Sequence, residues 1–150
     1  MTRTALTLAT LSTGLVAGLF AAFAYAVSPG LRRVDDGAFV QTMRAVNAAI
    51  LNPVLGLLFA GGLLAVVAAA VLTWSTDARP WVVAGMVLYA ATVLITLAAN
   101  VPLNDALAAG AGSAAHLRAA FEDAWTRWNL VRTGTGTAAF ACLAVAGLHL

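Results

Sequence analysis

The stretch "WVVAGMVLYAATVLITLAA" (residues 81–99) is apolar almost without interruption, and "NVPLND" (residues 100–105) follows it directly. A helix rises about 1.5 Å per residue and needs roughly 20 residues to cross the hydrocarbon core of a bilayer. Because backbone groups in lipid must be hydrogen-bonded within their own segment, this stretch predicts a transmembrane helix. The helix ends in two amides, Asn100 and Asn104, on either side of a proline, and the role of these amides needs an explanation.

The composition of the whole chain also indicates a membrane protein. The 150 residues are 62% hydrophobic and only 9% charged, with a mean hydropathy of +0.92. A soluble domain of this size needs more charge to cover its surface. We therefore expect residues 1–150 to form a single transmembrane domain of a multi-pass protein in a cell membrane, with the lipid bilayer as its partner.

Charge and cysteine content exclude several classes of function. The net charge of +2 arises from eight arginines and six acids, and it is too small to indicate nucleic-acid binding. Cys142 is the only cysteine, so the chain forms no intrachain disulfide and no dithiol redox pair.

Four apolar segments predict the fold class, which is an all-α, integral membrane four-helix bundle. Pro53 should kink the second helix, and helical extensions are expected in connections one and three. The first segment could instead be a secretory signal with "AYA" (residues 24–26) as its cleavage site, although its apolar run is long for that role. The spans are about Ala5–Val27, Ala48–Trp74, Trp81–Ala99 and Thr133–Leu150.

The segment "WTRWNLVRTG" (residues 125–134) places polar and aromatic side chains on one helical face. At 100° per residue, the stripe is about 120° wide, which is the arc that a helix turns toward its neighbours. An arginine and an amide facing lipid are costly, so such residues normally point inward. The alternative is anchoring of tryptophan and arginine at the membrane interface. The stripe comprises Arg118, Phe121, Glu122, Trp125, Trp128, Asn129 and Arg132.

Alternating span directions bring the polar residues to one side of the membrane. The ends of spans one and three and the starts of spans two and four must lie together. Arg44 and Arg132 should therefore gather with both tryptophans and with five amides, which are Asn47, Asn52, Asn100, Asn104 and Asn129. Alternatively, Asn100 simply caps a short helix begun by Pro102.

Three short motifs match a known family. "NVPLND" fits an Asn-x-Pro-x-Asn pattern, "WTRWNLVRT" fits Trp-Asn-x-x-Arg-Thr, and "MRAVN" (residues 43–47) precedes both. The sequence resembles the anthrone-oxygenase-like (DUF1772) family of integral membrane proteins over essentially its whole length. The matched positions are Met43, Asn47, Asn100, Pro102, Asn104, Trp128, Asn129 and Arg132.

The resemblance implies a membrane-embedded oxygenase that oxidises an anthrone-like or other electron-rich aromatic substrate with O2. An anthrone carbanion reduces oxygen directly, so we expect neither a cofactor nor a metal. A protein need only orient the planar substrate and stabilise its enolate oxygen. We expect Asn129, Arg132 and Asn100 to be catalytic. The expected substrate-binding residues are Asn47, Asn104, Trp125, Trp128, Met43 and Phe121.

The general base is less clear from the sequence. Glu122 and His116 are the nearest titratable groups, but Glu122 can also pair with Arg118 one turn earlier on the same helix. All six acids lie outside the spans, which argues against a proton-coupled exporter.

Three alternatives to an oxygenase remain open. The protein could bind a quinone-like or aromatic lipid without turnover, it could hold haem through His116, or it could be a structural helper subunit. Homo-oligomerisation is open as well. Most arginines lie in connections one and three, so the positive-inside rule predicts that these connections are cytoplasmic and that both termini lie outside.

Overall fold

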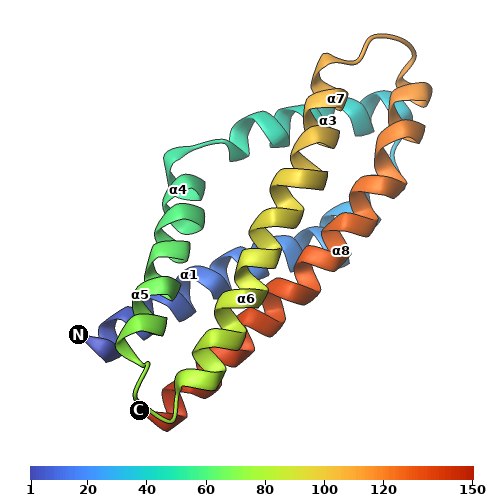
Figure 1. Ribbon diagram of the computed structural model, residues 1–150. Helices are drawn as coiled ribbons and strands as arrows, with labels where there is room; N and C mark the ends of the chain where they lie inside the picture. Colours follow the sequence, from blue (N-terminus) through green and yellow to red (C-terminus); the bar gives the residue numbers. More distant parts are fainter.

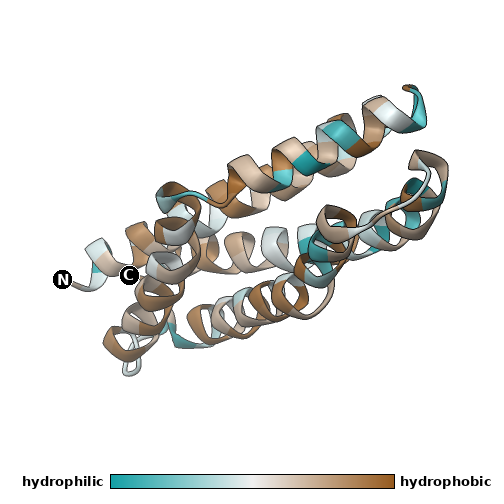
Figure 2. Cartoon of the chain, turned by 90° about the horizontal axis from the view of Figure 1, so that it is seen from above, coloured by the Kyte–Doolittle hydropathy of each residue, from teal (hydrophilic) through white to brown (hydrophobic).

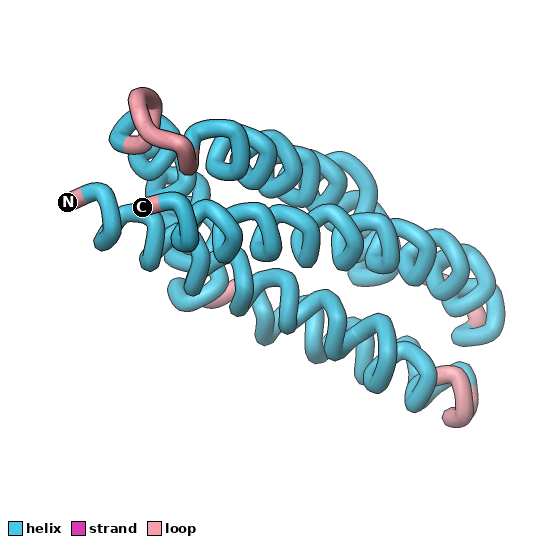
Figure 3. Tube along the Cα trace, turned by 90° about the horizontal axis from the view of Figure 1, so that it is seen from below, coloured by secondary structure: helices cyan, strands magenta, loops and turns pink.

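The computed structural model describes all 150 residues, and nearly all of them are helical (Figures 1 and 3). There is no β-strand. Four helices are long and apolar enough to cross a membrane, and they are Thr2–Leu31, Pro53–Leu72, Arg79–Ala109 and Ala114–His149. The predicted all-α membrane bundle with four spans is thereby confirmed.

Each of the first three long helices contains one π-helical turn of five residues. The first helix is α1 (Thr2–Ala22), the turn Phe23–Val27 and α2 (Ser28–Leu31). The second is α4 (Pro53–Gly56), the turn Leu57–Gly61 and α5 (Gly62–Leu72). The third is α6 (Arg79–Ile95), the turn Thr96–Asn100 and α7 (Val101–Ala109). The fourth is α8 (Ala114–Ala146) with a final 3₁₀ turn, Gly147–His149.

The four long helices pack in a ring, in which α1 contacts α5, α5 contacts α6, α6 contacts α8, and α8 contacts α1. Helices in lipid gain little from hydrophobic burial against each other, so their association depends on close packing at small residues. Gly85 is such a position, because a Cβ there would lie 2.9 Å from Leu143 Cγ. Gly62 is a second such position, because a Cβ there would collide with the hydroxyl of Tyr89. This hydroxyl donates to the carbonyl of Leu58 at 3.1 Å.

Two prolines explain two of the π-helical turns. Pro29 and Pro102 each stand two residues after the end of such a turn, at Val27 and Asn100 respectively. Proline donates no N–H and crowds the carbonyl four residues earlier, and a widened turn relieves both problems without ending the helix. The helices therefore continue past the ends that we predicted, near Val27 and Ala99.

The second span begins later than predicted, because the chain breaks between α3 (Asp36–Ile50) and α4. Leu51 forms an inverse γ-turn with φ −76° and ψ 72°, in which Asn52 N donates to Ile50 O at 2.9 Å. Asn52, held extended before Pro53, accepts from the backbone N–H groups of Val54 and Leu55. The kink expected at Pro53 is thus a complete break, and span two is Pro53–Leu72 rather than Ala48–Trp74.

Connection one lies across one end of the bundle (Figure 1). Asp35 caps α3 by accepting from Ala38 N at 2.9 Å. Polar residues are concentrated in α3 and the helix ends near it (Figure 2). Both chain termini lie at the opposite end, where Arg3 donates to Leu150 O at 3.1 Å. We call the α3 end of the bundle the polar end.

Two clusters of buried side chains divide the interior along the bundle. The larger cluster, which includes Phe20 and Leu143, fills the half toward the termini. The smaller cluster, which includes Phe23, Met43 and Trp125, lies under α3 at the polar end. The candidate site lies where these two clusters meet.

Candidate functional site

The inward face of α8 carries the central residues of the site. Phe121, Trp125, Asn129 and Arg132 are all buried, and Arg132 is only 6% exposed. The predicted stripe, apart from Trp128, therefore faces the other helices. α8 begins before the membrane span, where Ser113 caps it by accepting from His116 N. From there the helix continues through the site without a break.

Arg132 is held in place by a short chain of hydrogen bonds. Its Nε donates to Asn129 Oδ1 at 3.0 Å, and Asn129 Nδ2 donates to the carbonyl of Phe20 at 3.1 Å. This assignment of the amide is forced, since arginine only donates and a carbonyl only accepts. The guanidinium carbon lies 3.9 Å from the centroid of the Phe20 ring and 5.2 Å from that of Trp125. Cation–π contacts of this kind stabilise a desolvated guanidinium.

The two amides of "NVPLND" both bind Trp125. Asn104 Oδ1 accepts from the indole Nε1 at 2.8 Å, and Asn100 Nδ2 donates to the Trp125 carbonyl at 3.3 Å. Asn100 is fully buried, lies inside a continuous helix and makes no capping bond. The alternative role of Asn100 as a helix cap is therefore wrong. The two amides beside Pro102 instead fix the position of a tryptophan.

Asn47 enters the site from α3, which covers the polar end. Arg44, one turn earlier, holds α3 against α7 by donating from Nε to Leu107 O at 2.9 Å and from Nη2 to Gly110 O at 2.7 Å. Asn47 Nδ2 is buried and has no hydrogen-bond partner. Asn100 Oδ1 is in the same state. Buried polar atoms are nearly always paired in proteins, and Asn47 lines the cavity described next, so its unpaired donor is available to an oxygen acceptor on a ligand.

These side chains surround a cavity of about 60 Å³. Its polar wall consists of Asn47, Asn104, Arg132 and Thr96, and its apolar wall includes Phe20, Phe23, Phe59 and Trp125. Each of the three π-helical turns contributes one wall residue, namely Phe23, Phe59 and Thr96. π-Helical turns are rare and often occur at functional sites. Sequence reasoning missed Phe20, Phe23 and Phe59, because aromatic residues inside apolar spans resemble ordinary core.

A family model for anthrone oxygenase matches residues 43–142, which are 100 of the 150 residues. The chain belongs to the anthrone oxygenase family. The match confirms the resemblance seen in the motifs, and it includes Asn47, Asn104, Trp125 and Arg132 at the cavity. Neither a curated protein nor a solved structure matches the chain.

Several residues expected at the family's site lie elsewhere. Trp128 is 43% exposed on the outer face of α8, because it sits at the edge of the predicted stripe. Phe121 and Met43 are buried but belong to the packed cluster beneath α3 and do not line the cavity. Phe121 instead stacks on Trp125, with ring centroids 5.8 Å apart. Asn129 and Asn100 are fully buried behind Arg132 and Trp125, to which they are hydrogen-bonded.

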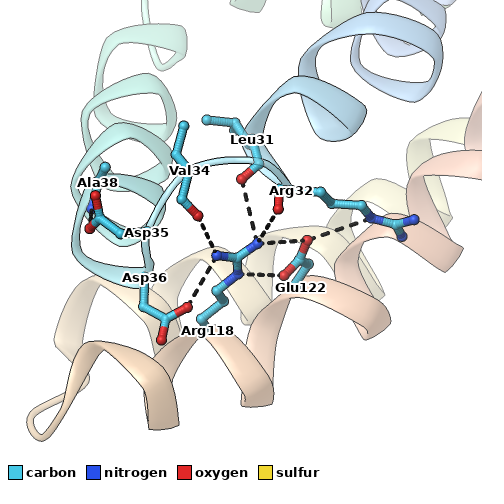
Figure 4. A network of polar contacts seen from close by, with 8 residues as sticks. All are labelled: Leu31, Arg32, Val34, Asp35, Asp36, Ala38, Arg118 and Glu122. Atoms are coloured by element: carbon cyan, nitrogen blue, oxygen red, sulfur yellow. Dashed lines mark hydrogen bonds and ion pairs between the residues drawn. The ribbon is translucent and has the colours of Figure 1, made fainter.

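The two candidate bases are also outside the cavity. Glu122 accepts from Arg118 Nε at 2.6 Å and pairs with Arg32 at 3.5 Å (Figure 4). Arg118 further binds Asp36 at 3.1 Å and the carbonyl of Val34 at 2.9 Å. This cluster joins connection one to α8. His116 is exposed, so no carboxylate or imidazole lines the cavity.

Proposed function

We propose that the protein is a membrane-embedded oxygenase that oxidises an anthrone-like aromatic substrate with O2 and without a cofactor. One observation carries this proposal. Arg132 is buried at an aromatic cavity, it hydrogen-bonds to the protein only through Nε, and both of its terminal nitrogens are left for a ligand. Family membership independently supports the same class of reaction.

The electrostatics of the cavity favour a ligand that becomes negatively charged. Arg132 is the only charged side chain that the structure buries, and none of the six acids lies at the cavity wall. A buried charge without a partner is costly, so an anion that forms beside Arg132 is stabilised strongly. Two parallel N–H groups of a guanidinium suit the oxygen of an enolate.

The proposed reaction begins with loss of a proton from the methylene between two rings, which leaves an enolate with its charge on the carbonyl oxygen. Arg132 stabilises that oxygen. The enolate transfers one electron to O2, and the resulting radical and superoxide combine at the former methylene carbon to give a peroxide anion. This anion takes up a proton from water, which balances the proton lost in the first step. The hydroperoxide then loses water to give a quinone carbonyl. In sum, CH₂ and O2 become C=O and H₂O, so no further reductant or oxidant is required.

The proton has to leave without a side-chain base. Glu122 is engaged by two arginines away from the cavity, and neither histidine lines it. We infer that the substrate ionises because Arg132 lowers the free energy of its enolate, and that water accepts the proton. Substrates are therefore restricted to compounds whose C–H bond is already acidified by flanking rings and a ketone.

A carrier that binds a quinone-like lipid without turnover is the second candidate. The absence of a carboxylate or imidazole from the cavity wall favours it, because binding needs only the aromatic walls, Asn47 and Arg132. The two functions differ in a measurable way, since only the oxygenase consumes O2 and forms product.

The deciding experiment uses purified protein in lipid nanodiscs, incubated with an anthrone and O2, with quinone absorbance and oxygen uptake followed together. Arg132→Gln and the double variant Asn129→Ala/Arg132→Ala should lose about 100-fold or more in kcat/KM, as expected for loss of an oxyanion donor. Arg127→Gln is the matched control, because Arg127 is exposed on the same helix and should leave the rate unchanged. Equal rates for wild type and the double variant would refute the oxygenase and leave the carrier.

A further inference from the structure

We propose that the cavity is loaded sideways from the bilayer, through a groove on the membrane-facing surface between α4 and the junction of α6 with α7. This inference rests on the proposed function, and it adds the route and the physical state of the substrate. The substrate would be a neutral, flat aromatic molecule dissolved in the membrane. Its carbonyl oxygen would enter the cavity first.

The groove and the cavity lie on two sides of one thin wall. The groove measures about 420 Å³, against about 60 Å³ for the cavity. Five residues line both, and they are Leu51, Leu55, Phe59, Thr96 and Val101. The two spaces are therefore adjacent, and the residues between them are mainly apolar.

The cavity is too small for a tricyclic substrate. Sites for small molecules typically measure roughly 300–1,000 Å³. A substrate must therefore displace part of the wall, and rotation of the five shared side chains would merge the cavity with the larger groove outside. The combined space then falls within the usual range.

The segment that forms one side of the groove is weakly attached. α4 is separated from α3 by the γ-turn at Leu51, and the side chain of Asn52 bonds only to the backbone of Ala49, Val54 and Leu55. No hydrogen bond joins α4 to another helix. Movement of α4 away from Val101 therefore breaks no tertiary hydrogen bond, whereas opening the polar end would break the bonds of Arg44 to α7.

The polar atoms at the inner end of this route define the ligand. Asn47 Nδ2 is a buried donor without an acceptor, and the terminal nitrogens of Arg132 are donors as well. Both call for an oxygen acceptor on the ligand. The groove itself offers only Asn52 and Thr96 as polar side chains, so an ion would lose its hydration there without compensation. The molecule must enter neutral and ionise only after it reaches Arg132.

The test measures how fast anthraquinone, a neutral quinone that cannot be oxidised further, reaches Trp125. In nanodiscs, the triple variant Trp74→Phe/Trp81→Phe/Trp128→Phe leaves Trp125 as the only fluorophore of its kind. Stopped-flow quenching then gives the association rate. Leu55→Phe and Val101→Phe fill the groove and should slow association at least tenfold, while Leu55→Ala widens it and should speed association. Leu64→Phe is the control, since Leu64 is lipid-exposed on α5 and outside the groove.

The outcomes separate this inference from the proposed function. Association that slows with the filled groove and speeds with the widened one supports lateral loading, even if no oxidation occurs. Association rates that are the same in Leu55→Phe, Leu55→Ala and wild type would overturn it, even if the protein proves to be an oxygenase. Absence of any quenching in the wild type would overturn it as well, because the cavity would then not admit an aromatic ligand. Thermal unfolding of each variant confirms that the fold is intact.

Discussion

Arg132 shows at the scale of one residue how a site for an anion conflicts with stability. The side chain is buried beside Phe20 and Trp125, and only Asn129 accepts a hydrogen bond from it. The protein therefore carries an uncompensated charge in its interior. Buried charges that lack a compensating partner are retained at a cost to stability, and replacing them with apolar side chains is often neutral or stabilising.

The variant Arg132→Met should therefore separate stability from function. We expect its thermal unfolding midpoint in detergent to be equal to or above that of the wild type, while quinone formation is lost. Arg118→Met provides the contrast, because Arg118 binds two carboxylates and several backbone carbonyls. Its loss should lower the free energy of unfolding by roughly 2–3 kcal/mol. A clear fall in the midpoint for Arg132→Met would show that the guanidinium is structural.

Single residues also show where sequence reasoning succeeds. The inward positions of Asn129 and Arg132 follow from helical periodicity and from the cost of exposing polar groups to lipid. Helical periodicity could not show that Trp128 is exposed whereas Trp125 is buried. A residue at the edge of a stripe faces lipid or the interior depending on where the neighbouring helix lies. The pairing of Asn104 with Trp125 Nε1 was also hidden, since it joins residues 21 positions apart on different helices.

At the scale of helical elements, the π-helical turn Thr96–Asn100 places two groups of the site. Thr96 lines the cavity, and Asn100 holds the carbonyl of Trp125. The turn accommodates Pro102, which cannot donate to the carbonyl of Ala98. A π-helical turn holds one residue more than an α-helical turn, so its loss would rotate the side chains on one side of it by roughly 100° relative to those on the other.

Pro102→Ala should therefore stabilise the protein and weaken its site. The new N–H allows a regular α-helix, which can raise the free energy of unfolding by up to about 3 kcal/mol. The rotation should reduce anthraquinone affinity, measured by quenching of Trp125. Pro80→Ala serves as the control, because Pro80 stands in the first turn of α6, where a missing N–H costs nothing. Lower stability together with unchanged affinity would contradict the role assigned to the turn.

The prolines were visible in the sequence, but their consequences were not. Proline is a common signal that a helix ends, but the helices continue beyond Pro29 and Pro102. Only Pro53 ends a helix, because Asn52 supplies a cap for the new one. Whether a proline breaks, widens or merely bends a helix depends on partners that the local sequence does not reveal.

At the scale of the whole molecule, the gathering of polar groups at one end follows from topology alone. Four spans of alternating direction must bring Asn47, Asn100 and Asn129 to the same side. The structure agrees, because Asn100 bonds to Trp125, Asn129 bonds to Arg132, and Asn47 lines the same cavity as Trp125 and Arg132. The small cavity and the groove beside it could not be predicted, because both depend on how far α4 stands from α7. Span count and the side of the site are thus encoded locally, whereas the shape of the site is a property of packing.

The structure also sharpens the prediction of membrane orientation. Of the six arginines near the polar end, Arg132 is buried and Arg44 is bound to α7, so neither reports orientation. Arg118 is bound to Glu122, Asp36 and the carbonyl of Val34 and is left out on the same ground. Arg32, Arg33 and Arg127 remain, against Arg3 and Arg79 at the other end. The positive-inside rule therefore still places the polar end in the cytoplasm and both termini outside.

Single cysteines introduced into a Cys142→Ala background test this orientation in intact cells. Ser75 lies in the exposed turn between α5 and α6, and Ala111 lies in the exposed turn between α7 and α8. A membrane-impermeant maleimide should label Ser75→Cys in intact cells, but Ala111→Cys only after permeabilisation. The reversed pattern would place the polar end outside the cytoplasm. In that case Arg32 and Arg118 would be retained for their contacts with Glu122, Asp36 and the carbonyls of connection one rather than for topology.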